Sequence, residues 1–166
     1  MINIAEYIDR GGLIVYILLV LNIVGFAIIL WKVFIFSKVK YDTISKDVLD
    51  DIHNNSEIVK LTTIKSSIYK QMQSLEVGIN TIKTIASIAP LLGLLGTVVG
   101  VLGSFDNITM SGLDDPTVFS DGISVALITT VAGMIVAIPH YVAYNYFIGF
   151  LDKIQNNIES KVLSSL

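Results

Sequence analysis

Three long segments of this chain contain almost no charged residue, and this feature constrains the fold more than any other. They cover residues 11–36, 84–105 and 122–151, and only Lys32 interrupts the first. About 20 consecutive apolar residues are enough for a helix to cross a bilayer. The composition agrees, because only 15% of the residues are charged, against roughly 25% in soluble domains. The chain is therefore expected to be an all-α membrane protein with three transmembrane helices.

The distribution of basic residues predicts the orientation of the chain. Seven lysines lie within residues 37–84, and Lys153 and Lys161 follow the third apolar segment. Residues 106–121 contain four aspartates and no Lys or Arg. Because basic segments stay on the inner side of a membrane, the N-terminus and residues 106–121 are expected outside. Residues 37–84 and the C-terminus are expected inside.

These spans divide the chain into seven segments. The expected transmembrane helices are residues 11–36, 85–105 and 122–147. The first apolar run exceeds the roughly 7–15 residues of a signal-peptide core, so it is expected to stay in the protein. The other segments are an N-terminal segment (1–10), a largely helical inner segment (37–84), an outer turn (106–121) and an inner C-terminal helix (148–166). For the N-terminal segment a short interfacial helix and a frayed end are both open.

Apolar residues continue at helical spacing beyond the second and third spans. The pattern predicts one helix from near Ser56 to Phe105 and another from Pro116 to about Leu163. Both would extend from the membrane on the inner side. The first stripe comprises Ile58, Leu61, Ile64, Ile68, Met72, Leu75, Ile79 and Ile82, and the second Leu151, Ile154, Ile158 and Val162.

Small residues form a stripe on each of these two spans. In the second span, which reads APLLGLLGTVVGVLGSF over residues 89–105, the stripe is Gly93, Gly96, Gly100 and Gly103. In the third span it is Ala126, Gly133 and Ala137, with Thr130 in the same series. In lipid, small residues let two helix backbones approach closely, so both stripes are expected to be helix-packing faces. A general helix-dimer face is the alternative.

Thr97 and Thr130 accompany the two stripes, one on each span. Their hydroxyl groups are candidates for lining a narrow, partly polar interior between the helices. The alternative for each threonine is a hydrogen bond to a carbonyl of its own helix, which is common in membrane helices.

Catalytic and cofactor-binding patterns are missing from the sequence. There is no cysteine, and we find no nucleophile–base pair, metal-ligand cluster or phosphate-binding loop. The chain is therefore expected to be no enzyme and to bind no metal or cofactor. A net charge of −3 gives no reason to expect nucleic acid binding. His140 is interpreted as a structural histidine rather than a proton relay.

The second and third spans resemble the MotA/TolQ/ExbB proton channel family. The resemblance rests on A-P-x-x-G-L-x-G-T-V-x-G and then A-L-x-T-T-x-A-G-x-x-V-A-I-P, and it covers roughly residues 85–147. Three spans and a short chain are most similar to the ExbB type, although the TolQ type shares the pattern. A structural membrane scaffold without an ion path is the alternative from another class.

The resemblance implies a homopentameric bundle around a central pore in the bacterial inner membrane. The N-terminus would then be periplasmic and the C-terminus cytoplasmic. A single-span partner of the ExbD/TolR type would enter the pore and supply the aspartate that takes the proton, and a TonB-type protein would receive the motion. Thr97 and Thr130 match the family's pore-lining threonines.

One position departs from the family pattern. Val125 stands where the enterobacterial members of the family carry a glutamate at the start of the third span. The role of that glutamate is therefore not transferred to this chain. Apart from His140, no Asp, Glu, Lys, Arg or His lies between Lys83 and Asp106 or between Asp121 and Asp152.

Overall fold

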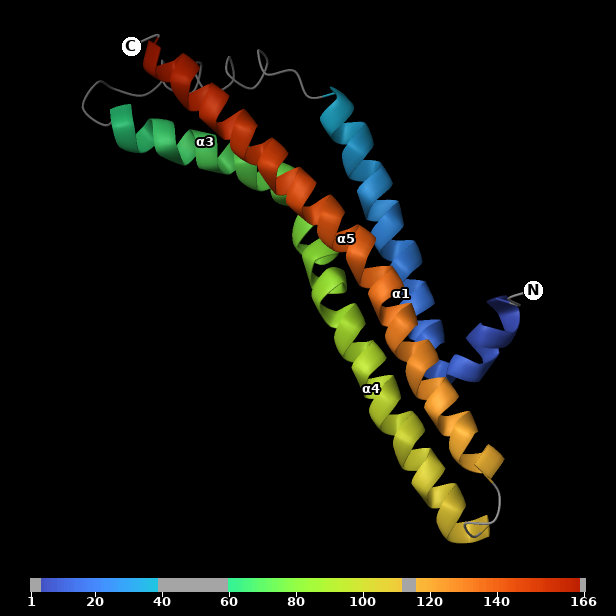
Figure 1. Ribbon diagram of the computed structural model, residues 1–166. Helices are drawn as coiled ribbons and strands as arrows, with labels where there is room; N and C mark the ends of the chain where they lie inside the picture. Colours follow the sequence, from blue (N-terminus) through green and yellow to red (C-terminus); the bar gives the residue numbers. More distant parts are fainter. Residues whose placement is uncertain (1–3, 39–59, 112–115, 165–166) are drawn as a thin grey trace.

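The computed structural model describes residues 4–38, 60–111 and 116–164. These residues form helices and no strands. The helices are α1 (Ile4–Lys38), α3 (Lys60–Glu76), α4 (Ile79–Ser111) and α5 (Pro116–Ser164) (Figure 1). Three stretches are long and apolar enough to cross a membrane: Tyr7–Lys38, Ile79–Asn107 and Ser120–Ser160. The prediction of an all-α, multi-pass membrane protein with three spans is confirmed.

The long helices α4 and α5 run antiparallel and side by side (Figure 1). α1 lies against α5 and α4 on one side of this pair, and α3 lies beside the C-terminal part of α5. α5 begins at Pro116, as predicted, because proline favours the first turn of a helix, where its missing N–H costs nothing. The helix then continues through Pro139 to Ser164.

α1 consists of two parts that meet at Gly12. This glycine has φ 61° and ψ −155°, a positive-φ conformation that is open essentially to glycine alone. The residues before it therefore form a short helix that turns away from the direction of the span (Figure 1). Of the two possibilities for the N-terminal segment, the structure has the short helix from Ile4.

The prediction of one continuous helix through to Phe105 is wrong. α3 ends at Glu76 and α4 begins at Ile79, with Gly78 at φ 86° between them. Glycine in this conformation commonly ends a helix. The break lets α3 follow α5 instead of continuing along the axis of α4 (Figure 1). Ser56, the expected start of the helix, lies outside the described residues.

An apolar core fills the end of the molecule where α3 lies. The two amphipathic stripes predicted from the sequence contact each other there, because α3 and α5 bury them against one another and against the end of α1. The buried members of this core are Phe36, Ile68, Met72, Ile79, Ile82, Phe147, Leu151, Ile154 and Ile158.

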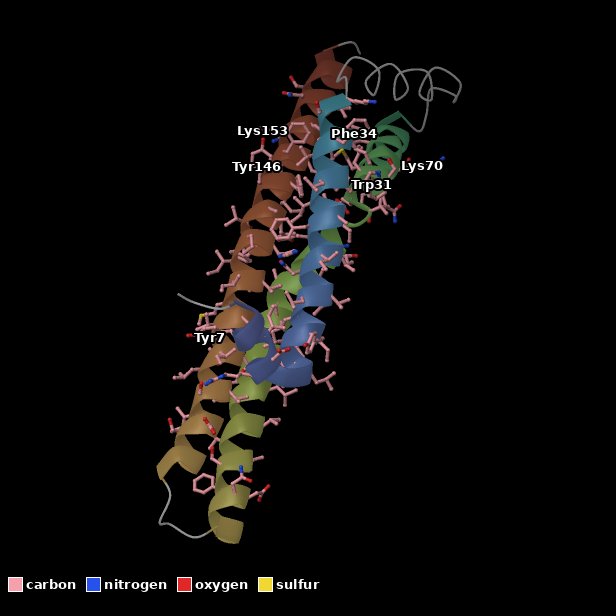
Figure 2. The ribbon with its side chains drawn as sticks, turned by 90° about the vertical axis from the view of Figure 1, so that its right-hand side faces the viewer. Tyr7, Trp31, Phe34, Lys70, Tyr146 and Lys153 are labelled. Atoms are coloured by element: carbon pink, nitrogen blue, oxygen red, sulfur yellow. The ribbon has the colours of Figure 1, made fainter. Side chains whose placement is uncertain are left out.

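The outer surface of the three spans is strongly apolar. Leu13 is 76% exposed, Ile23 68% and Leu91 63%. A helix that is apolar on all sides is either fully buried or faces lipid, so these side chains are expected to face acyl chains or neighbouring subunits. Trp31, Phe34 and Tyr146 gather toward the end of the molecule at which Lys70 and Lys153 also lie (Figure 2), a distribution that is typical of a membrane–water boundary.

Candidate functional site

The contact between α4 and α5 is formed by glycines. A Cβ atom added to Gly133 would lie 2.6 Å from the carbonyl oxygen of Ala89 and 3.1 Å from the Cα of Gly93. One added to Gly93 would lie 2.8 Å from the carbonyl oxygen of Thr129. The atoms met are backbone atoms, which cannot rotate away. The two helices therefore approach so closely here that only glycine fits.

The same seam, formed by the small residues of α4 and α5, continues toward the turn between these helices. A Cβ at Gly100 would lie 2.8 Å from the carbonyl oxygen of Gly122 and 3.1 Å from the amide nitrogen of Ala126. One at Gly96 would overlap the side chain of Thr129, with Cγ2 at 2.7 Å. Gly96 thus provides the space into which a side chain of α5 inserts.

Two residues of the predicted stripes lie elsewhere. Gly103 is exposed, and a Cβ there would meet nothing within 4 Å. It is therefore not part of the seam within one chain. Ala137 is buried in a cluster that includes Leu18 of α1 as well as Ala89 of α4. Its small side chain thus lies where α1, α4 and α5 meet.

Thr97 and Thr130 are both half-buried. The hydroxyl of Thr97 donates a hydrogen bond to the carbonyl of Leu94 at 2.6 Å, and that of Thr130 donates to the carbonyl of Ala126 at 3.2 Å. Each threonine therefore makes the bond to its own helix that was the alternative to a pore-lining role. That bond uses the hydroxyl hydrogen only. The oxygen lone pairs remain able to accept a hydrogen bond from another group.

The sequence alone did not identify two hydroxyl residues that the seam buries completely. Thr129 is 0% exposed, inserts against Gly96 and donates to the carbonyl of Ala126 at 2.9 Å. Ser104 is 1% exposed, donates to the carbonyl of Gly100 at 3.2 Å and contacts Gly122. Both side chains fill the space that the glycines leave. Their spacing of three or four residues from members of the two small-residue stripes was the sequence signal that could have identified them.

His140 lies outside the seam, where α5 contacts α1. It is 0% exposed, and its Nδ1–H donates to the carbonyl of Val136 at 2.7 Å. Its Nε2 points at Gly25, where a Cβ would overlap the ring, and the ring packs edge-on against Phe26 at 5.2 Å between centroids. Among the described residues, Nε2 has no hydrogen-bond partner. The histidine therefore packs between α1 and α5 and does not face the seam between α4 and α5.

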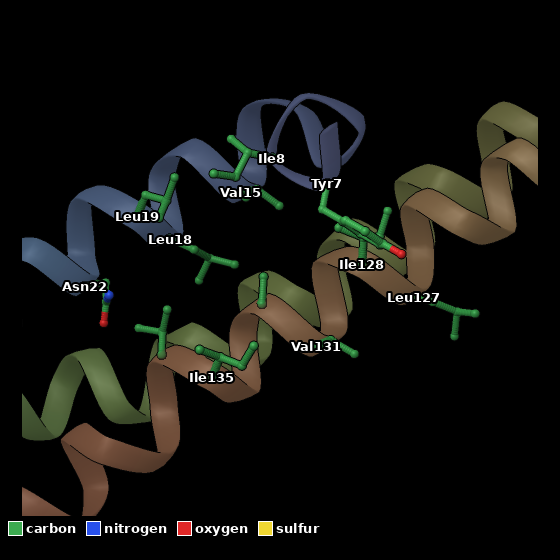
Figure 3. Close-up of a pocket in the computed structure, with 12 residues that line it drawn as sticks. Tyr7, Ile8, Val15, Leu18, Leu19, Asn22, Leu127, Ile128, Val131 and Ile135 are labelled. Atoms are coloured by element: carbon green, nitrogen blue, oxygen red, sulfur yellow. The ribbon is translucent and has the colours of Figure 1, made fainter. Parts of the chain in front are cut away.

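A groove of about 620 Å³ separates the first half of α1 from α5. Tyr7 and Ile8 of the short N-terminal part close one side of it. Leu19 of α1 and Ile135 of α5 also line it (Figure 3). Asn22 contributes the main polar group, and its Oδ1 is buried without a partner among the described residues. The lining otherwise suits hydrocarbon chains and offers no site for a charged ligand.

Within the described parts of the chain, no group of three His, Cys, Asp or Glu side chains is placed to hold a metal ion. The chemistry that the seam offers is therefore that of hydroxyl oxygens and backbone carbonyls. Such groups orient water and accept hydrogen bonds, but they do not gain or lose a proton near neutral pH.

A sequence model of the MotA/TolQ/ExbB proton channel family matches residues 36–160. The match covers well over half of the chain and includes both helices of the seam. No curated protein matches the chain.

Proposed function

Because this chain belongs to the MotA/TolQ/ExbB proton channel family, we propose that it is the ExbB-type subunit of a proton-driven complex in the bacterial inner membrane. In this proposal a homopentamer surrounds a pore, and a single-span partner of the ExbD/TolR type occupies it. The complex couples the proton-motive force to TonB-dependent transport across the outer membrane. The N-terminus is periplasmic and the C-terminus cytoplasmic, as the lysine distribution favours.

The observation that supports the proposal most directly is the chemistry of the seam. Thr97 and Thr130 are the half-buried hydroxyl groups beside its glycines, and each retains lone pairs that can accept a hydrogen bond. A protonated carboxyl group is a hydrogen-bond donor, whereas a carboxylate only accepts. The two threonines would therefore favour the protonated form of an aspartate that enters beside them.

The titrating group itself must come from another chain. Between Thr84 and Phe105, and between Gly122 and Leu151, His140 is the one Asp, Glu, Lys, Arg or His side chain. It is enclosed between α5 and Gly25 of α1. An ionisable group at bilayer depth is costly and usually functional, so the proton carrier of the complex is assigned to the partner helix.

The test is a proton-flux assay on liposomes that contain the chain with its ExbD/TolR-type partner, or the chain alone. Flux is expected only with the partner. The Thr97→Val, Thr130→Val double variant keeps the side-chain shape and should reduce flux at least tenfold, or about 1.4 kcal/mol, without changing assembly. Thr84→Val is the matched control, because Thr84 is exposed and donates to Asn80 in the same manner, at 2.8 Å.

Two results would contradict the proposal. Flux through the chain alone that disappears in His140→Ala would make His140 the carrier. An unchanged flux in the double variant would return both threonines to a purely structural role. If the double variant instead impairs envelope integrity and leaves ligand uptake intact, the TolQ-like role replaces the ExbB-like one.

A further inference from the structure

A buried lysine connects α1 to the break between α3 and α4. Lys32 lies within the first apolar segment, yet its side chain is only 2% exposed. Its Nζ donates a hydrogen bond to the carbonyl of Leu75 at 2.9 Å. The centroids of the Trp31 and Phe36 rings lie 5.5 and 5.7 Å from Nζ. A lysine at this end of a span would ordinarily extend to water. Lys32 instead points into the protein, where it makes these defined contacts.

The position of the acceptor explains why this contact is favourable. Leu75 belongs to the last turn of α3, which ends at Glu76. The last four carbonyls of a helix have no partner within the helix and carry the negative end of its dipole. An ammonium group placed there satisfies one of these carbonyls and complements the dipole. Lys32 therefore caps α3 from a different helix.

The same turn of α1 also contacts the residue at which the chain changes direction. A Cβ added to Gly78 would lie 3.3 Å from Cγ2 of Ile28 and 3.7 Å from Cε of Lys32. Ile28 and Lys32 are one helical turn apart and so lie on the same face of α1. That face thus contacts both the last turn of α3 and the glycine after it.

We propose that Lys32 is a latch that fixes the angle between α3 and α4. While its ammonium group is bound to Leu75, the end of α3 is held against α1, and Gly78 cannot change its conformation without breaking this bond. Release of Lys32 would leave α3 held only by its apolar packing, chiefly on α5, so that α3 could shift along α5 and turn about Gly78. A displacement of α1 would thereby change the direction of α3, independently of which role within the family the complex has.

The experiment measures a distance across the break. The chain has no cysteine, so spin labels can be attached at Tyr69→Cys on α3 and Ile88→Cys on α4, which are 69% and 41% exposed. Residue 69 lies nine residues before Gly78. At about 1.5 Å per residue, a swing of about 20° would displace it by roughly 5 Å. Labelled chains are diluted in unlabelled ones so that only distances within one chain are measured.

The latch predicts a narrow distance distribution in the parent chain and a distribution broadened or shifted by roughly 5 Å in Lys32→Met, from the same lever arm. Lys32→Arg keeps the charge and the hydrogen-bond donors, so its distance distribution should stay as narrow as that of the parent chain. Lys38→Met is the matched control, because Lys38 is an exposed lysine on the same helix, and it should change nothing.

Lys32→Gln is measured alongside, since it keeps a hydrogen-bond donor without the buried charge. Its distribution should be narrower than that of Lys32→Met. A parent-like distribution in Lys32→Met would overturn the latch. If Lys32→Met does not yield folded protein, the decision rests on Lys32→Arg, and a broad distribution in that variant would overturn it equally.

Discussion

The close approach of α4 and α5 can be tested with one methyl group at two glycines. In Gly133→Ala the new Cβ would lie 2.6 Å from the carbonyl oxygen of Ala89 and 3.1 Å from the Cα of Gly93. Real Cβ atoms essentially never lie under 3.0 Å from another heavy atom, so the two helix backbones must separate by at least about 0.4 Å. At Gly103 the same methyl group would meet nothing within 4 Å.

Gly133→Ala and Gly103→Ala both replace a glycine inside a helix with alanine, and they differ in the contact that the new methyl group makes. Forcing a methylene-sized group into a packed site typically costs about 1–3 kcal/mol. Alanine is favoured over glycine inside a helix by about 0.8–1 kcal/mol, and this gain applies to both variants. Gly133→Ala is therefore expected to be less stable than Gly103→Ala by about 1–3 kcal/mol. Gly103→Ala itself should be neutral or slightly stabilising.

The assay follows separation of α4 from α5 during a denaturant titration in detergent micelles. A fluorophore pair at Asn80→Cys and Asn145→Cys, both exposed and far along the chain from the connecting turn, reports loss of the helix pair through energy transfer. Gly133→Ala should shift the midpoint to lower denaturant than Gly103→Ala. Coincident unfolding curves for the two variants would refute the inference that the seam holds the helices in backbone contact.

Two further predictions concern α1 and the membrane orientation. Gly25→Ala should loosen α1 from α5 and lower the thermal stability, because its Cβ would overlap the fully buried ring of His140. Adding His140→Ala to this variant should relieve the defect. Gly149→Ala, whose Cβ would meet nothing within 4 Å, should leave the thermal stability unchanged. A membrane-impermeant thiol reagent should label Asn107→Cys in spheroplasts and Lys153→Cys only after permeabilisation, since both positions are exposed, and the opposite pattern would reverse the orientation.

The helical spans were predictable from the sequence because length and lack of charge determine them almost alone. Residues that cannot be hydrated favourably enter the bilayer, and a helix satisfies their backbone groups internally. The amphipathic stripes were predictable for a similar reason. The spacing of Ile68 and Met72 on one helix and of Ile154 and Ile158 on another already specifies two apolar faces, and the structure packs these faces together.

The break at Gly78 was not predictable from that spacing. Leu75, Ile79 and Ile82 continue the helical periodicity across the break, so the apolar pattern carries no sign of it. At the end of α3, Gly78 has a positive φ, and Lys32, far away in the sequence, donates a hydrogen bond to the carbonyl of Leu75. A long-range contact of this kind satisfies a carbonyl at the helix end and complements the helix dipole, and local periodicity contains no information about it.

The seam shows a second limit, set by the rotation of a helix about its own axis. Thr129 and Thr130 both lie at a spacing of three or four from Ala126 and from Gly133, so the stripe alone does not decide which threonine faces α4. The structure inserts Thr129 against Gly96 and leaves Thr130 half-buried. The fully enclosed hydroxyl of Thr129 is bonded within its own helix, whereas a half-buried hydroxyl is also open to a group from another chain. Within the pair, Thr130 is therefore the residue that the proposed function assigns to a partner helix, whereas Thr129 packs against Gly96 between α4 and α5.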